Sequence, residues 1–249
     1  MLFRSIAAWT EIEKLIFAGQ STYQQLKYAP FPVVAAPAGM ALGGGCEILL
    51  HADAVQAHAE LYAGLVETGV GLVPGWGGCK EMLWRWGSDP KAPRGPMPAP
   101  AKVFEMVSMA RVAKSAAEAR EMKILRADDA ITMNRYRLLA DAKAKALALA
   151  VDYAPPQQTT MRLPGAAGRV GMDMAVAGFR KRGIAMPHDV TVGAGLAEIL
   201  SGGPCDPTDE LAEGDILALE RSVFLRLIRT KGTLARIEHT LETGKPLRN

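Results

Sequence analysis

The sequence predicts an α/β fold followed by a helical C-terminal segment, and three observations support this. A short apolar run at 33–36, β-branched at its start and bounded by prolines, leads into the glycine turn 43–45 as a buried strand would. A helix-forming stretch and a second short apolar run follow the turn, in the order typical of an α/β unit. Apolar residues beyond Pro155 and Pro156 recur at helical spacing.

The individual elements follow from local patterns. Apolar residues recur every three or four positions from Trp9 onward, which predicts an amphipathic helix that ends near Tyr28, before Pro30 and Pro32. Five prolines between 90 and 100 predict an irregular loop. Further elements are expected as a helix at 46–50, a strand at 53–57, a helix at 80–86, a capped helix at 115–125, a helix at 135–150, and tail helices at 168–182, 188–200 and 213–242, the last broken near Gly232.

Pro155 and Pro156 open a stretch without clear periodicity, so a domain boundary is expected there. Residues 1–154 are expected to form the α/β part of the chain. Residues 155–249 are expected to form a helical C-terminal part without strands.

Composition excludes several classes of protein. The 249 residues carry a net charge of +3 from 29 basic and 26 acidic residues that are scattered along the chain, which gives no sign of a nucleic-acid or membrane-binding patch. No apolar run reaches the roughly 18 residues of a membrane span. The cysteines Cys46, Cys79 and Cys205 lack CxxC spacing and nearby histidines, which argues against disulfides and against a metal site. A reducing cytoplasm is therefore the expected location.

Two glutamates stand out because each lies in an apolar setting. Glu47 follows the glycine turn in a stretch that is otherwise apolar, and Glu67 lies among small and apolar residues at 64–71. A buried carboxylate costs free energy unless it is paired, solvated in a cleft or used in a reaction. Paired carboxylates in apolar surroundings can acquire the separated or raised pKa values that general acid/base catalysis requires near neutral pH.

The glycine turn by itself allows two interpretations. A strand that leads through glycines into a helix lets backbone amides approach a ligand closely and directs the helix N-terminus at negative charge. The same turn can also serve close packing of a helix against a strand, with no ligand involved. The residues alone leave both interpretations open.

Two segments resemble the signatures of the crotonase (enoyl-CoA hydratase/isomerase) family. They are PVVAAPAGMALGGGCE at 32–47 and VETGVGLVPGWGG at 66–78. The two glutamates are 20 residues apart, as is usual in the family's hydratases, and the helix at 115–125 resembles the family's SAxEA segment. The resemblance covers residues 35–150 and implies a crotonase-like ββα spiral core, truncated at its N-terminus and followed by a helical C-terminal subdomain.

The resemblance also implies a reaction, the syn addition of water to a trans-2-enoyl-CoA. Glu47 would help to deprotonate the attacking water, and Glu67 would deliver a proton to the α-carbon. The Gly44 amide would serve in the oxyanion hole that binds the thioester oxygen, and Gly75 would lie near the attacking water. No separate cofactor is implied, because coenzyme A is part of the substrate.

The end of the chain suggests a larger parent protein. Residues 241–249, LETGKPLRN, are similar to the end of long bacterial chains in which a 3-hydroxyacyl-CoA dehydrogenase precedes a hydratase. The partners that this resemblance implies are an acyl-CoA substrate, an upstream dehydrogenase domain and a trimer-based homo-oligomer. We expect no nucleic-acid partner.

The sequence also departs from the family pattern. Val66 replaces the usual proline, residues 79–81 stand where a Thr-Gln-Arg run is common, and the insertion at 84–101 is longer than usual. The family's FSxGxD-like segment, which supplies the first oxyanion amide, has no counterpart before Ser5. We therefore expect a truncated and poorly active part of a longer chain.

Two alternatives remain beside hydration. The chain could be an enoyl-CoA isomerase, although such relatives commonly keep the second glutamate without the first. It could instead be a catalytically incomplete assembly fragment of the bifunctional protein. A dinucleotide site at Gly165, Gly168 and Gly171 is not expected, because no strand pattern precedes these glycines.

Overall fold

The computed structural model describes residues 8–249. Residues 1–4, which entered the expectation of truncation, lie outside this range. The helices are α2 (Trp9–Lys27), α3 (Gly44–His51), α4 (Gly78–Gly87), α5 (Pro98–Ser108), α6 (Ala116–Glu121), α7 (Leu138–Leu149), α8 (Gly165–Lys181), α9 (Pro187–Leu200), α10 (Glu213–Leu227) and α11 (Lys231–Thr243), with 3-10 turns η1 (Glu67–Val70), η2 (Arg135–Arg137) and η3 (Ala150–Asp152). The strands are β1 (Val34–Ala35), β2 (Gly39–Leu42), β3 (Ala54–His58), β4 (Leu61–Gly64), β5 (Ala130–Thr132), β6 (Thr160–Met161) and β7 (Leu211–Ala212).

Two small parallel sheets form the α/β part of the molecule. One has the strand order β1-β3-β5, and the other pairs β2 with β4. In the second sheet Leu42 pairs with Gly64, the last residues of their strands. The glycine turn after β2 and the segment after β4 therefore leave the sheet at the same edge, which is why Glu47 and Glu67 lie in one region.

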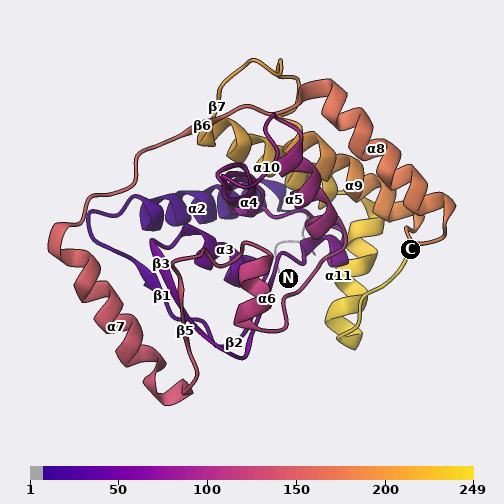
Figure 1. Ribbon diagram of the computed structural model, residues 1–249. Coiled ribbons are helices and arrows are strands. Elements are labelled where there is room, and N and C mark those ends of the chain that lie inside the picture. Colours follow the sequence, from indigo (N-terminus) through magenta and orange to yellow (C-terminus); the bar gives the residue numbers. More distant parts are fainter. Residues whose placement is uncertain (1–7) are drawn as a thin grey trace.

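The helices connect this edge to the C-terminal part of the chain. Helix α3 packs on β2 and on α4, and α10 packs on α2, α4 and α9. In Figure 1 strands β1, β2, β3 and β5 lie with α7 at the lower left, α8, α9 and α11 lie at the right, and β6 and β7 lie at the top beside α10. One cluster of buried apolar residues extends from Leu50 and Leu61 to Leu196 and Leu227. The segments 1–154 and 155–249, whose division remains a prediction, thus share a core within the described range.

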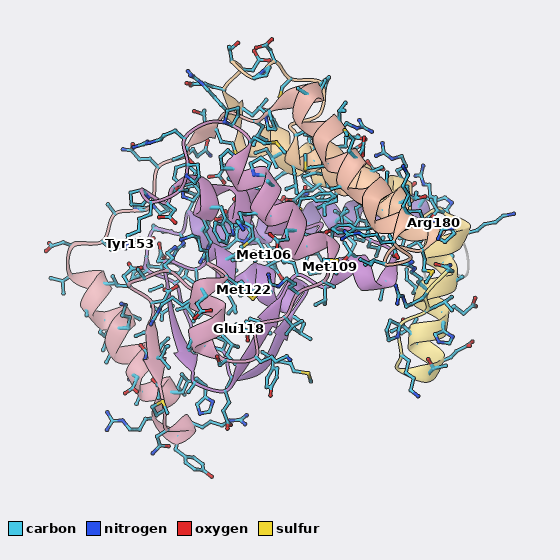
Figure 2. All side chains as sticks on the ribbon, turned by 45° about the vertical axis from the view of Figure 1, so that its right-hand side comes forward. Met106, Met109, Glu118, Met122, Tyr153 and Arg180 are labelled. Atoms are coloured by element: carbon cyan, nitrogen blue, oxygen red, sulfur yellow. The ribbon has the colours of Figure 1, made fainter. Side chains whose placement is uncertain are left out.

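A methionine-rich contact joins α5 and α6 to the segment that follows β4. Met106 from α5 and Met122, which caps α6, lie near the centre of the molecule in Figure 2. Both line a small internal pocket together with Leu65 and Met82. Flexible methionine side chains adapt to such irregular spaces. Leu65, which directly follows β4, therefore packs near α5 and α6.

The predicted helices agree with the structure apart from their ends. The Ser115 hydroxyl accepts a 3.1 Å hydrogen bond from the Glu118 amide, as the capping pattern predicted, but α6 ends at Glu121 rather than 125. The prediction of a strand-free tail was wrong, because β6 and β7 pair antiparallel over two residues each. Strands this short carry no readable alternation. The loop expected to extend to 100 ends earlier, because α5 begins at Pro98 and proline is well tolerated in a first helical turn.

Candidate active site

The glycine turn orients the N-terminus of α3. Gly43 has a φ of 55°, in the left-handed region that favours glycine, and its amide donates to Gly64 O at 2.9 Å. The Gly43 carbonyl accepts hydrogen bonds from the amides of Cys46 and Glu47 inside the helix. Because C=O and N–H point in opposite directions across a trans peptide, the Gly44 amide points away from the helix. It is one of the helix-terminal amides that lack an intrahelical acceptor.

Two aromatic residues hold this turn in place. The Tyr23 hydroxyl donates to Gly44 O at 3.0 Å, and the rings of Tyr23 and Trp76 meet edge to face with centroids 5.5 Å apart. A Cβ atom on Gly44 would lie 2.9 Å from the Trp76 ring, so only glycine leaves room for this approach. The position and direction of the Gly44 amide are therefore fixed by packing as well as by the turn.

Glu47 is almost fully buried, with 2% of its surface exposed. Its Oε1 accepts hydrogen bonds from the amides of Trp76 at 2.9 Å and Gly78 at 2.8 Å, in the segment that leads into α4. Burial raises the pKa of Glu47 to about 7, although the two amide bonds oppose this shift. The group can therefore exchange a proton near neutral pH while its orientation is fixed by two donors.

Glu67 begins η1, three residues after β4 ends. Its Oε1 would lie 3.1 Å from a Cβ atom built on Gly43, so the carboxyl group reaches the glycine turn. Its Oε2 is buried and has no hydrogen-bond donor among the described residues. Burial and the charge of Glu47 together raise the pKa of Glu67 to about 8.

The two predicted carboxylates thus form an electrostatically coupled pair beside the N-terminus of α3. Glu47 has two amide donors, which favour its ionised form relative to Glu67. Glu67 lacks a donor on Oε2 and is also repelled by Glu47, which favours its protonated form. One base and one acid next to a free helix-terminal amide is the arrangement needed to move protons on a carbonyl substrate.

Gly75, the fourth residue predicted for the site, lies in the segment that supplies the donors to Glu47. Its carbonyl accepts a 2.9 Å hydrogen bond from Gln20 Nε2, and a Cβ atom there would lie 3.0 Å from the Phe224 ring. These contacts are to α2 and α10 rather than to either glutamate. Gly75 directly precedes Trp76, whose amide donates to Glu47. The predicted position of Gly75 near an attacking water remains a proposal.

Sequence reasoning missed a third buried carboxylate at this place. Glu220 on α10 is 0% exposed and binds the amides of Gly77 and Lys80. Burial and the charge of Glu47 raise its pKa to about 8, even though its two amide bonds and Lys80 lower it. The sequence does contain an indication of this residue, because Glu220 is a lone glutamate on an otherwise apolar helix face. The same kind of pattern drew attention to Glu47.

A second group of buried charges surrounds Lys80 and Glu81 of α4. Lys80 contacts Glu81 and Glu213, the latter at 2.8 Å, and Lys27 contacts the same two carboxylates at 2.7 and 2.9 Å. Burial alone would raise the pKa of Glu81, but the charges of Lys80, His51 and Lys27 bring it far below its usual value. These carboxylates are neutralised by partners, unlike those at the glycine turn.

A cavity of about 410 Å³ borders the segment that follows Glu67. Its wall includes Thr68 and Gly69 from η1, Val176 and Phe179 from α8, and Val192 from α9. The wall is mainly apolar, and the guanidinium of Arg236, which also lines the cavity, is paired with Asp189 at 2.7 Å. The cavity therefore suits a neutral aliphatic group better than an ion.

Residues 8–249 contain no group of three or more histidine, cysteine or acidic side chains that could hold a metal ion. The cysteines Cys46, Cys79 and Cys205 are all free. Among the helices in this described range, none is both long and apolar enough to cross a membrane.

The chain resembles known proteins in sequence. Residues 10–92 match the family described as Enoyl-CoA hydratase/isomerase. A Bacillus subtilis (strain 168) protein named "Probable 3-hydroxyacyl-CoA dehydrogenase" is 41% identical over 243 residues, which cover 96% of this chain and 30% of that protein. A Rickettsia felis protein named "Putative fatty acid oxidation complex trifunctional enzyme" is 49% identical over 79 residues, which cover 32% of this chain and 11% of that protein. The chain thus spans less than a third of either relative.

The chain also resembles solved structures. An enoyl-CoA hydratase/isomerase from Pseudoalteromonas atlantica T6c aligns with a TM-score of 0.54 at 15% identity, over 91% of this chain and 68% of that one. A carnitinyl-CoA hydratase from Mycobacterium avium aligns with a TM-score of 0.50 at 20% identity, over 87% of this chain and 62% of that one. These similarities confirm the predicted α/β, crotonase-like fold.

Proposed function

We propose that this chain is the enoyl-CoA hydratase part of a fatty-acid β-oxidation protein. The match of residues 10–92 to the enoyl-CoA hydratase/isomerase family supports this proposal. The observation that carries this proposal is the coupled pair of Glu47 and Glu67, with pKa values raised to about 7 and about 8, beside the N-terminal amide of α3. The names of the two relatives support the link to fatty-acid oxidation.

The different surroundings of the two glutamates support different roles. Glu47, whose Oε1 is held by two amides, acts as the base that takes a proton from the attacking water. The water oxygen then bonds to the β-carbon, and the π electrons of the double bond move toward the thioester. Glu67 donates its proton to the α-carbon, which completes the addition. Afterwards Glu47 releases its proton to solvent and Glu67 takes one up, which restores both groups.

The Gly44 amide stabilises the negative charge that develops on the thioester oxygen. It points out of α3 because the Gly43 carbonyl points into the helix, and the helix dipole adds to its effect. Tyr23 fixes the next peptide through its bond to Gly44 O. The preorganised donor therefore requires no rearrangement when charge appears on the substrate.

The acyl chain is proposed to occupy the cavity that begins at Thr68 and Gly69. Its apolar wall and its position directly after Glu67 in the chain suit an aliphatic group. A protein of this kind would act in the cytoplasm as a trimer-based homo-oligomer, with a dehydrogenase domain elsewhere in the parent chain.

The direct test is hydration of crotonyl-CoA, followed by the loss of enoyl thioester absorbance. In deuterated water the product should carry one deuterium at the α-carbon. Conversion of a trans-3-enoyl-CoA to the trans-2 isomer without any hydration would instead favour the isomerase. Absence of both reactions in a folded sample would contradict the proposal and favour the assembly fragment.

A second test concerns the dehydrogenase named in the relatives. Gly165, Gly168 and Gly171 lie inside α8, and β6 before them is a two-residue antiparallel strand, so these residues do not form a strand-to-helix dinucleotide turn. Addition of NAD⁺ and 3-hydroxybutyryl-CoA to the 249-residue chain should give no NADH absorbance. Formation of NADH in proportion to the amount of purified chain would contradict this prediction.

A further inference from the structure

The segment that enters α4 is held by carboxylates from two different parts of the chain. The amides of Trp76 and Gly78 donate to Glu47 Oε1. The amides of Gly77 and Lys80 donate to Glu220, to Oε2 at 2.7 Å and to Oε1 at 2.9 Å. Glu47 comes from α3, whereas Glu220 comes from α10, more than 140 residues later in the chain.

Helix α4 has no cap of its own. Its N-cap residue is Gly77, with a φ of 103° and no side chain to accept a hydrogen bond. The first amides of a helix need acceptors from elsewhere when they are buried. Glu220 supplies two acceptor oxygens at once. The left-handed turn at Gly77 is therefore fixed by a side chain from the C-terminal segment.

The amides held by the two carboxylates alternate along the backbone, so the two sets cannot move independently. Gly77 lies between Trp76 and Gly78, and each peptide plane is rigid. A rotation that freed the Gly77 amide from Glu220 would also turn the peptides on either side of it. Gln20 and Phe224 add contacts at Gly75, which limit movement at the start of the segment.

We propose that Glu220 is a positioning residue for the base Glu47, because it fixes the segment whose Trp76 and Gly78 amides orient the Glu47 carboxylate. This rests on the proposed function of Glu47 as the base in hydration. Glu220 does not touch the substrate in this proposal. It links the C-terminal helical segment to the chemistry of the glycine turn.

Substitution of Glu220 separates positioning from substrate binding. Glu220→Gln keeps the shape of the side chain, but its NH₂ group would face one of the two amide donors and leave that amide without an acceptor. We expect kcat for crotonyl-CoA hydration to fall about tenfold to a hundredfold, the scale of effect that a small misplacement of a reacting group produces. KM should stay within about twofold, because no contact with the substrate is removed.

Amide hydrogen exchange of the segment 75–80 gives a readout that does not depend on activity. In Glu220→Gln the amides of Trp76 and Gly78 should exchange at least about tenfold faster, although their own acceptor Glu47 is unchanged. A shorter side chain, Glu220→Asp, keeps both carboxyl oxygens but reaches less far, and we expect smaller changes of the same kind. This variant serves as the test if Glu220→Gln lowers the yield of folded protein.

Glu213→Gln is the matched control. Glu213 is also a buried carboxylate on α10, but it binds Lys80 Nζ, Lys27 and Tyr28 rather than backbone amides. It should lower the melting temperature while leaving exchange at Trp76 and Gly78 and the value of kcat within about twofold of the original. A loss of kcat in both variants in proportion to lost stability would overturn the proposal.

The exchange and kinetic results distinguish two kinds of failure. If Glu220→Gln changes exchange only at Gly77 and Lys80 and leaves kcat unchanged, Glu220 is a helix cap and not a positioning residue. If the original chain hydrates no enoyl-CoA, the proposed function fails. Faster exchange at Trp76 and Gly78 in the variant would then still establish that Glu220 positions the donors to Glu47, whereas unchanged exchange would refute it.

Discussion

Two groups of carboxylates are buried near α4, and they differ in their partners. Beside the glycine turn, Glu47 and Glu67 have no cationic partner within the described residues, and their pKa values are raised to about 7 and about 8. In the second group, Glu81 and Glu213 contact Lys27 and Lys80, and the pKa values of both carboxyl groups are lowered. Burial of a carboxylate therefore does not by itself identify a catalytic residue, because its partners decide whether its pKa is raised or lowered.

The contrast also separates roles in catalysis from roles in stability. An unpaired buried carboxylate costs free energy in the folded protein, and its retention suggests a use in the reaction. A paired one contributes mainly through the penalty of breaking the pair. Substitutions at the two places should consequently affect different measurements.

The largest effect is expected from Glu47→Gln and Glu67→Gln. Each should lower kcat for crotonyl-CoA hydration by about 10²–10⁴-fold, the usual contribution of a general acid or base. The melting temperature should not fall in Glu67→Gln, because Glu67 Oε2 makes no hydrogen bond in the described structure. It should barely fall in Glu47→Gln, because the glutamine carbonyl oxygen can still accept hydrogen bonds from the Trp76 and Gly78 amides. The exposed Glu105→Gln on α5 is the control and should keep full activity. Activity close to the original in either site variant would remove that glutamate from the mechanism.

A large loss of stability is expected from Lys80→Met. This substitution retains the aliphatic part of the side chain but leaves the buried Glu81 and Glu213 with one cation, Lys27, in place of two. Removal of one partner from a buried ion pair typically costs about 3–5 kcal/mol. Urea unfolding should reveal this loss. A variant as stable as the original would mean that the cluster is not maintained by charge pairing.

Sequence reasoning predicted the pair Glu47 and Glu67, because both lie in glycine-rich segments that resemble family signatures. A charged residue in an apolar stretch can also be recognised from the sequence alone. It also predicted most helices, because a helical face recurs every three or four residues. Strands β2 and β4, which bring the two glutamates to one sheet edge, were not predicted. They have four residues each, and their glycines and alanines give no alternation.

The contacts from α10 could not be predicted for a different reason. Glu220 and Glu213 act on residues about 140 positions earlier, and the pairing depends on how α10 packs against α2 and α4. Only the setting of Glu220 was visible, as an acidic residue within an apolar helical pattern. Nothing in one sequence indicates that Glu220 meets backbone amides whereas Glu213 meets lysines, so their different roles required the structure.

The smallest expected effect is a difference in how stability depends on pH. The pKa of Glu67 is raised from 4.5 to about 8 in the folded protein, so below pH 4.5 the group is protonated in both states and has no effect. As the pH rises toward 8 the unfolded chain loses this proton first, so the folded state loses stability, and above 8 the loss is constant. Glu67→Gln should therefore gain stability relative to the original between pH 5 and 8, by about 1–3 kcal/mol.

Glu81 behaves in the opposite way, because its lowered pKa makes its contribution fully present above 4.5 and lost only at more acidic pH. The stability difference caused by Glu81→Gln should consequently stay constant between pH 5 and 8. Urea unfolding of both variants at pH 5, 6, 7 and 8 measures the two slopes. Equal slopes would show that Glu67 and Glu81 have the same electrostatic environment, and the contrast between unpaired and paired glutamates would then be wrong.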